Sequence, residues 1–141
     1  MVWHSCLAPQ SAVRTEELVQ LAGQTVAARP DNYFSVRSWG AALYRAGRYA
    51  EAVKKFQRAS ELHPSGGEPV DFAFLAMAQF RCGDLQSARR ALACGQQKLS
   101  SLQGAPRRYE NESLGGPSWS VRMEASLLIS EAAALVEGLK E

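Results

Sequence analysis

Long apolar runs and a strong net charge are both missing from this sequence of 141 residues. No stretch approaches the roughly 18 consecutive apolar residues of a membrane-spanning helix. The first ten residues, MVWHSCLAPQ, lack the basic region and the apolar core of a signal peptide. The formal net charge is only +2, which argues against nucleic acid or an anionic membrane as a partner. We therefore expect a cytoplasmic protein that binds neither.

Cysteine and histidine are scarce, and the motifs of enzymes are absent. The cysteines Cys6, Cys82 and Cys94 form no CxxC pair, so we expect reduced, mostly buried thiols rather than disulfides or a metal site. The two histidines, His4 and His63, belong to no HExxH motif, and no Walker A, GxGxxG, HRD or DFG motif occurs. We therefore predict a protein that is not an enzyme, with no catalytic residue, metal or cofactor.

Helical periodicity is what the sequence has in abundance. Apolar residues recur at intervals of three and four, whereas the alternating patterns typical of strands are absent. The fold class is therefore predicted to be all-α, with helices at residues 14–29, 33–46, 50–62, 70–82, 85–99 and 118–139. Residues 100–117, dense in Gly, Pro, Ser and Asn, are predicted to form a long loop. The last helix carries one apolar seam, made of Val121, Ala125, Leu128, Ala132, Leu135 and Leu139.

The two middle pairs of helices are copies of each other. A shift of 36 residues superimposes their large and small positions. The matched pairs are Trp39 and Leu75, Gly40 and Ala76, Gly47 and Gly83, Ala52 and Ala88, and Phe56 and Leu92. Self-similarity at such a period is the signature of a solenoid, in which each unit buries its apolar face against the next.

The stretch WGAALYRAGRYAEAVKKF, residues 39–56, resembles the tetratricopeptide repeat, whose pattern is W-x2-L-G-x2-Y, then A-x3-F, then P. Trp39-Gly40 stands at the L-G position, Ala52-x3-Phe56 matches outright, and Pro64 closes the unit, while other positions differ from the pattern. The second copy is a looser match and lacks the closing proline. The resemblance implies one helical-hairpin solenoid domain over residues 1–141. Its parts are a partial repeat (1–30), two repeats (33–64 and 69–99), the loop (100–117) and a C-terminal capping helix (118–139).

Most of the chain, including GAALYRAGRYAEAVKKF and FAFLAMAQFRCGDLQSARRAL, is also similar to the C-terminal tetratricopeptide region of large planctomycete proteins that are Ser/Thr kinases or WD40-type proteins. That resemblance implies a bacterial protein, and a chain that begins within a repeat is expected to be the tail of a longer one.

The family resemblance implies which residues line a concave, partner-binding groove, because the first helix of each hairpin faces it. The candidate groove residues are Phe34, Arg37, Tyr44, Arg45, Phe74, Met77, Phe80 and Arg81. Aromatic residues, Met and Arg are enriched in interface cores, but packing against a neighbouring helix explains the same residues equally well. In the family, Lys and Asn one turn apart hold a partner's terminal carboxylate. Arg37 and Ala41 stand there, and Ala41 has no side-chain donor.

Four functions compete for this pattern. The first is a non-catalytic scaffold that binds a protein, a peptide or another domain of its own longer chain. The second is a purely structural spacer or cap for a larger array. The third is an enzyme, and the missing motifs argue against it. The fourth is an RNA-reading helical repeat, and the small net charge argues against that.

Overall fold

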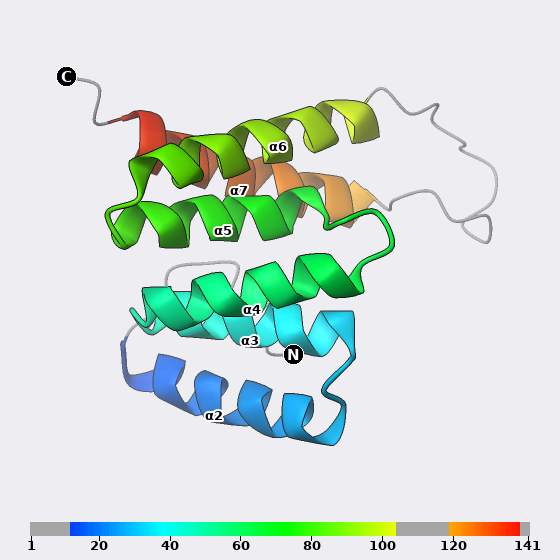
Figure 1. Ribbon diagram of the computed structural model, residues 1–141, viewed down its shortest axis with the longest axis vertical. Coiled ribbons are helices and arrows are strands. Elements are labelled where there is room, and N and C mark those ends of the chain that lie inside the picture. Colours follow the sequence, from blue (N-terminus) through cyan, green and yellow to red (C-terminus); the bar gives the residue numbers. More distant parts are fainter. Residues whose placement is uncertain (1–11, 104–118, 139–141) are drawn as a thin grey trace.

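The computed structural model describes residues 12–103 and 119–138 of the chain. These residues form helices and contain no strand. The helices are α2 (Ala12–Ala28), α3 (Tyr33–Arg45), α4 (Tyr49–Leu62), α5 (Pro69–Arg81), α6 (Leu85–Gln103) and α7 (Trp119–Glu137). Figure 1 shows them stacked along the long axis of the molecule, from α2 at one end to α6 and α7 at the other. The predicted all-α solenoid of helical hairpins is therefore confirmed.

The two central hairpins repeat with the predicted register. Helices α3 and α5 have 13 residues each and begin 36 positions apart, at Tyr33 and Pro69. Each hairpin turns at a glycine with positive φ, 81° at Gly47 and 87° at Gly83. This left-handed conformation strains any residue with a Cβ, so glycine ends the first helix of each hairpin and lets the second one start.

Small residues bring the two helices of each hairpin into close contact. A Cβ on Gly40 of α3 would lie 2.9 Å from Cε2 of Phe56 on α4. The side chain of Phe56 is fully buried. Ala52 on α4 and Ala88 on α6, the repeat-related small positions, are also fully buried. Ala52 and Ala88, which are matched in sequence, are thus equally buried in the two hairpins.

Helix α7 packs against both α5 and α6. Its buried residues are Ala125, Leu128, Ile129, Ala132 and Val136. Three members of the predicted seam are among them, whereas Leu135 is only partly buried and Val136 takes its place. The difference arises because a straight helix has 3.6 residues per turn, so a seam drifts by a fraction of a residue at each turn. The side chains of Val121 and Leu139 lie outside the described residues.

Two sequence predictions need correction. Helix α6 continues to Gln103 rather than ending at residue 99, so the start of the predicted loop at 100–117 is helical. The remainder of that loop lies outside the described residues, as do residues 1–11 of the predicted partial repeat. Cys82 and Cys94 are free and exposed rather than buried. Cys82 follows the last residue of α5 at the hairpin turn, where the chain passes through solvent.

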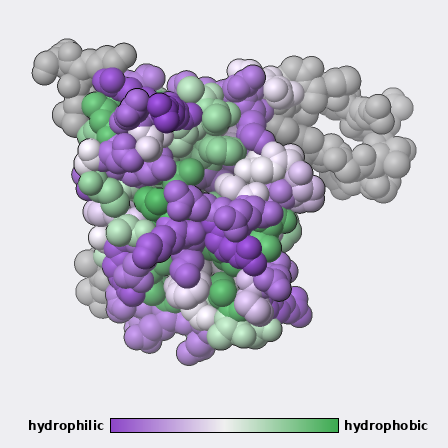
Figure 2. Space-filling model, viewed as in Figure 1, coloured by the Kyte–Doolittle hydropathy of each residue, from purple (hydrophilic) through white to green (hydrophobic). Residues whose placement is uncertain are grey.

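The outer face of α4 is strongly polar. Figure 2 shows hydrophilic residues in a band across the middle of this face of the molecule, where Figure 1 places α4. Lys54, Gln57 and Arg58 of α4 are exposed. Among the helices described, none combines the length and apolar character needed to cross a membrane.

Candidate functional site

Three aromatic rings meet where the two central hairpins contact each other. Tyr44, in the last turn of α3, is 6% exposed. Its ring centroid lies 5.4 Å from that of Tyr49 on α4 and 5.7 Å from that of Phe74 on α5. Phe74 in turn stacks on Phe56 with a centroid separation of 5.3 Å. The apolar core therefore extends to the end of α3 and holds Tyr44 in one position.

Arg45 lies against this aromatic group and reaches across to the C-terminal helix. Its guanidinium carbon is 5.5 Å from the centroid of Tyr44 and 5.4 Å from that of Phe74. Its Nη1 and Nη2 donate to Oε1 and Oε2 of Glu131 over 2.7 and 3.0 Å. The Arg45 side chain is 7% exposed and that of Glu131 34%. This bidentate pair connects residues 86 positions apart and ties α7 to the first central hairpin.

Arg81, one repeat after Arg45, lies at the edge of the same group of aromatic rings. It is exposed, and its guanidinium carbon is 6.0 Å from the ring centroid of Tyr49. Burial raises the pKa of Tyr44, while the hydrogen bond and the charge of Arg81 oppose that rise. No carboxylate of the described residues forms an ion pair with Arg81. We call Tyr44, Arg45, Tyr49, Phe74, Arg81 and Glu131 the Tyr44 cluster.

A second polar group lies at the opposite end of α3, around the link between the hairpins. Tyr33 Oη and the backbone N–H of Glu68 both donate to Oδ2 of Asp71, the second over 2.8 Å. Arg37 Nη1 donates to Glu68 Oε2 over 2.9 Å. Burial raises the pKa of Asp71, and the hydrogen bonds from Glu68 and Tyr33 and the charge of Arg37 oppose the rise. These contacts fix the start of α5 against α3.

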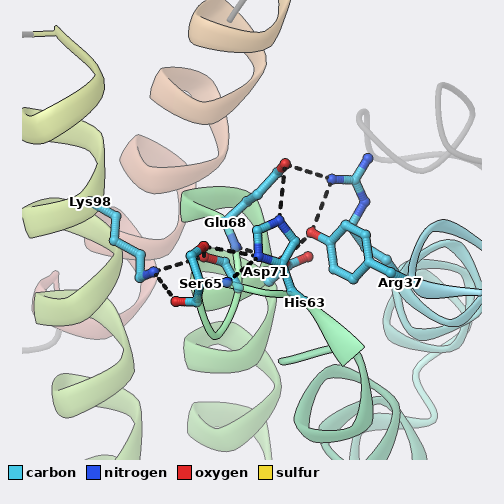
Figure 3. A network of polar contacts seen from close by, with 8 residues as sticks. Arg37, His63, Ser65, Glu68, Asp71 and Lys98 are labelled. Carbon is cyan, nitrogen blue, oxygen red and sulfur yellow. Dashed lines mark hydrogen bonds and ion pairs between the residues drawn. The ribbon is translucent and has the colours of Figure 1, made fainter. Parts of the chain in front are cut away.

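The link itself is held by His63 and Lys98 (Figure 3). His63 Nε2 lies 3.6 Å from Oε1 of Glu68, and its Nδ1 accepts a hydrogen bond of 3.1 Å from the N–H of Ser65. Lys98 Nζ donates to the carbonyls of Ser65 and Gly67 over 2.9 Å each. We call this group and the one around Asp71 the linker network. Its polar atoms mostly satisfy one another, which favours a structural role, and no group of metal-ligating side chains occurs within the described ranges.

The predicted groove residues fall into two places. Tyr44, Arg45, Phe74 and Arg81 come together in the Tyr44 cluster. Phe34 lies near the start of α3 with 60% of its surface exposed. The remaining residues do not face solvent freely: Met77 is fully buried, Phe80 packs partly against the core, and Arg37 is buried and paired with Glu68.

The acids nearest in sequence to Arg45 and Arg81 make contacts at the starts of their own helices. These acids are Glu51 and Asp84, respectively. In the structure Glu51 pairs with Arg48, and Asp84 accepts from the backbone of Ser87 at the start of α6. Each of these acids serves its own helix end.

Sequence reasoning missed Glu131, Tyr49 and most of the linker network. Glu131 interrupts the apolar stretch LLISEAAALV of α7, and a lone acid in such a stretch is a signal for a buried ion pair. Glu68 and Asp71 bracket the start of α5 with the spacing of a capping box, a local pattern that can be found by inspection.

Comparison with known proteins agrees with this architecture. Residues 37–65 match the family model of the tetratricopeptide repeat. Neither the curated proteins nor the solved structures contain a match to the chain. Tetratricopeptide repeats generally mediate protein–protein interaction and are generally not catalytic. The chain is therefore an all-α helical-repeat solenoid in which residues 37–65 are similar to a tetratricopeptide repeat.

Proposed function

We propose that this protein is a non-catalytic scaffold that binds an acidic peptide segment at the Tyr44 cluster. The observation that carries this proposal is that Arg45 and Arg81, one repeat apart in sequence, lie against the adjoining rings of Tyr44 and Tyr49. The segment belongs to a partner protein or to another domain of a longer chain.

The chemistry of the cluster favours an acidic ligand. Among the described residues, the cluster places two guanidinium groups and one carboxylate beside three aromatic rings. Guanidinium groups bind carboxylates in a bidentate manner, and Tyr and Arg are enriched among the residues that dominate binding energy. Arg81 is exposed and has no described carboxylate partner, so it is the natural first contact for a peptide carboxylate.

Phe34 provides a second contact at the other end of α3. The Phe34 ring contacts Tyr33 edge-on, with 5.0 Å between the ring centroids, and still has 60% of its surface exposed. The Arg37 guanidinium carbon lies 5.3 Å from its centroid and holds the ring from one side. An apolar side chain of the bound segment would cover the other side of the ring.

We place this function in the bacterial cytoplasm. Exposed, free Cys82 and Cys94 are compatible with a reducing compartment. The similarity to planctomycete kinase and WD40 proteins is the reason for proposing a bacterial source and a longer chain.

The test is a binding titration with a fluorescent polyglutamate peptide that has a free C-terminal carboxylate, followed by polarisation. The full chain should bind this peptide. Arg81→Gln should weaken binding by about tenfold, which is the scale of one charge-assisted hydrogen bond. Phe34 should not be needed, because polyglutamate has no apolar side chain to cover its ring. Arg89→Gln is the matched control, because Arg89 is an exposed arginine on α6 and its loss makes the same change in net charge. If the peptide binds saturably to neither the full chain nor any variant, the structural-spacer function is favoured instead.

A further inference from the structure

The position of Glu131 suggests how binding at the Tyr44 cluster is controlled. The Arg45 side chain is 7% exposed and lies between the rings of Tyr44 and Phe74. A guanidinium removed from water in this way is strongly destabilising unless an anion meets it. Glu131 supplies that anion through both of its oxygens. The free protein therefore already contains a carboxylate at a position that suits an acidic ligand.

The two partners of this pair are not equally buried. About a third of the Glu131 side chain is exposed (34%), whereas Arg45 is almost enclosed. The glutamate carboxylate can therefore turn into solvent while the guanidinium stays in place.

Helix α7 does not depend on the ion pair alone for its attachment. Leu128, Ile129 and Val136 are buried in the common core, and Ile129 reaches Gly95 of α6, where an added Cβ would lie 2.7 Å from Ile129 Cδ1. Apolar burial of this kind is the main stabilising term for a packed helix. Breaking the Arg45–Glu131 pair therefore leaves the seam of α7 in contact with α5 and α6.

We propose that Glu131 is an internal placeholder: it occupies the guanidinium of Arg45 until a carboxylate of an acidic peptide, first attracted by Arg81, replaces it. This inference rests on the proposed function and adds its regulation. The exchange swaps one carboxylate for another, so the peptide gains only the difference between two similar ion pairs. Binding by the free protein is correspondingly weak, and an acidic segment must also contact Arg81 or a neighbouring surface to displace Glu131.

Glu131→Gln tests the placeholder directly. The amide keeps the shape of the side chain and one acceptor oxygen, but it removes the competing charge. We expect the polyglutamate peptide to bind this variant about tenfold more tightly than it binds the unmodified chain. Glu137→Gln is the matched control, since it removes an exposed acid from the last turn of the same helix and makes the same change in net charge. Its affinity should stay close to that of the unmodified chain.

Folding of the variant is checked by its thermal melt. If Glu131→Gln melts below the assay temperature, Glu131→Asp is used instead, because it keeps the charge and withdraws the carboxylate by one methylene. The aspartate variant should also bind the peptide more tightly than the unmodified chain.

Each result decides the matter. Tighter binding by the residue 131 variant than by Glu137→Gln supports the placeholder. Equal or weaker binding, in an assay where the unmodified chain binds and Arg81→Gln binds about tenfold more weakly, overturns the placeholder and leaves the proposed function intact. Absence of binding in every form overturns both.

Discussion

Gly40 of α3 lies so close to Phe56 of α4 that a Cβ at residue 40 would be 2.9 Å from Cε2 and 3.1 Å from Cδ2 of the ring. Phe56 cannot move aside, because it is fully buried and stacks on Phe74 across the hairpin boundary. The contact between these two residues therefore sets the spacing of the first central hairpin. The position of Tyr44 and Arg45 at the end of α3 depends on that spacing.

Gly40→Ala should destabilise the protein. Overpacking in a filled core costs about 1–3 kcal/mol, and the gain in helix propensity of up to about 1 kcal/mol offsets only part of it. Gly23→Ala is the control, since a Cβ there would meet the Trp39 ring at an ordinary 3.7 Å. Urea unfolding should show a loss for the first variant and a small gain for the second. Equal effects of the two would contradict the close contact.

Leu128→Ala should destabilise far more than Leu127→Ala. Leu128 is 1% exposed, whereas its neighbour Leu127 is 65% exposed on the same helix. Truncating a buried leucine costs about 2–5 kcal/mol, and a surface change usually stays within about 0.5 kcal/mol. Thermal melts of the two variants measure the difference. Similar melting temperatures would show that α7 is not packed on α5 and α6 as described.

Asp71 makes stability depend on pH in an uncommon direction. Burial raises its pKa in the folded protein above the ordinary value of 3.8, so the folded state binds the proton more tightly than the unfolded state does. Its contribution to the free energy of unfolding therefore declines as pH rises from the unfolded pKa through the raised folded pKa. Asp71→Asn removes this contribution, so the deficit in its free energy of unfolding relative to the unmodified chain should narrow as pH rises above 3.8.

Asp84→Asn provides the contrast for that experiment. Hydrogen bonds from Ser87 lower the pKa of Asp84. Its contribution is therefore present above the unfolded pKa and is lost as pH falls, so the deficit of this variant should widen towards neutral pH. Urea midpoints measured across the pH range separate the two cases. Parallel curves for Asp71→Asn and the unmodified chain would refute the raised pKa of Asp71.

Much of the fold was predictable because its signals are local. Gly47 and Gly83 mark turns that need a positive φ, and the 36-residue match between hairpins follows from residue size alone. The pairing of Arg45 with Glu131 was not predictable in this way, because it joins residues 86 positions apart whose relative placement depends on how α7 docks. The exposure of Cys94 was not predicted either, because the burial of a small residue depends on its angular position around the helix rather than on its hydropathy.

The candidate site was predicted only in part for the same reason. The repeat register predicted that Tyr44 and Phe74 lie close together, because register sets which residues share a helix face, and the two rings are in contact. It did not distinguish Met77, which is fully buried, from Phe34, which is exposed. That distinction depends on the neighbouring helices that cover each position.

The claim that the Tyr44 cluster binds acidic segments is tested most directly by nuclear magnetic resonance. The spectrum of the full chain, including the arginine side-chain Nε–H signals, is followed while the polyglutamate peptide is added. The account predicts that the signals of Tyr44, Arg45 and Arg81 shift together and saturate, while those of His63 and Lys98 in the linker network stay unchanged. Shifts centred instead on Lys54 and Arg58 of α4, or no saturable shift at Arg81, would contradict it.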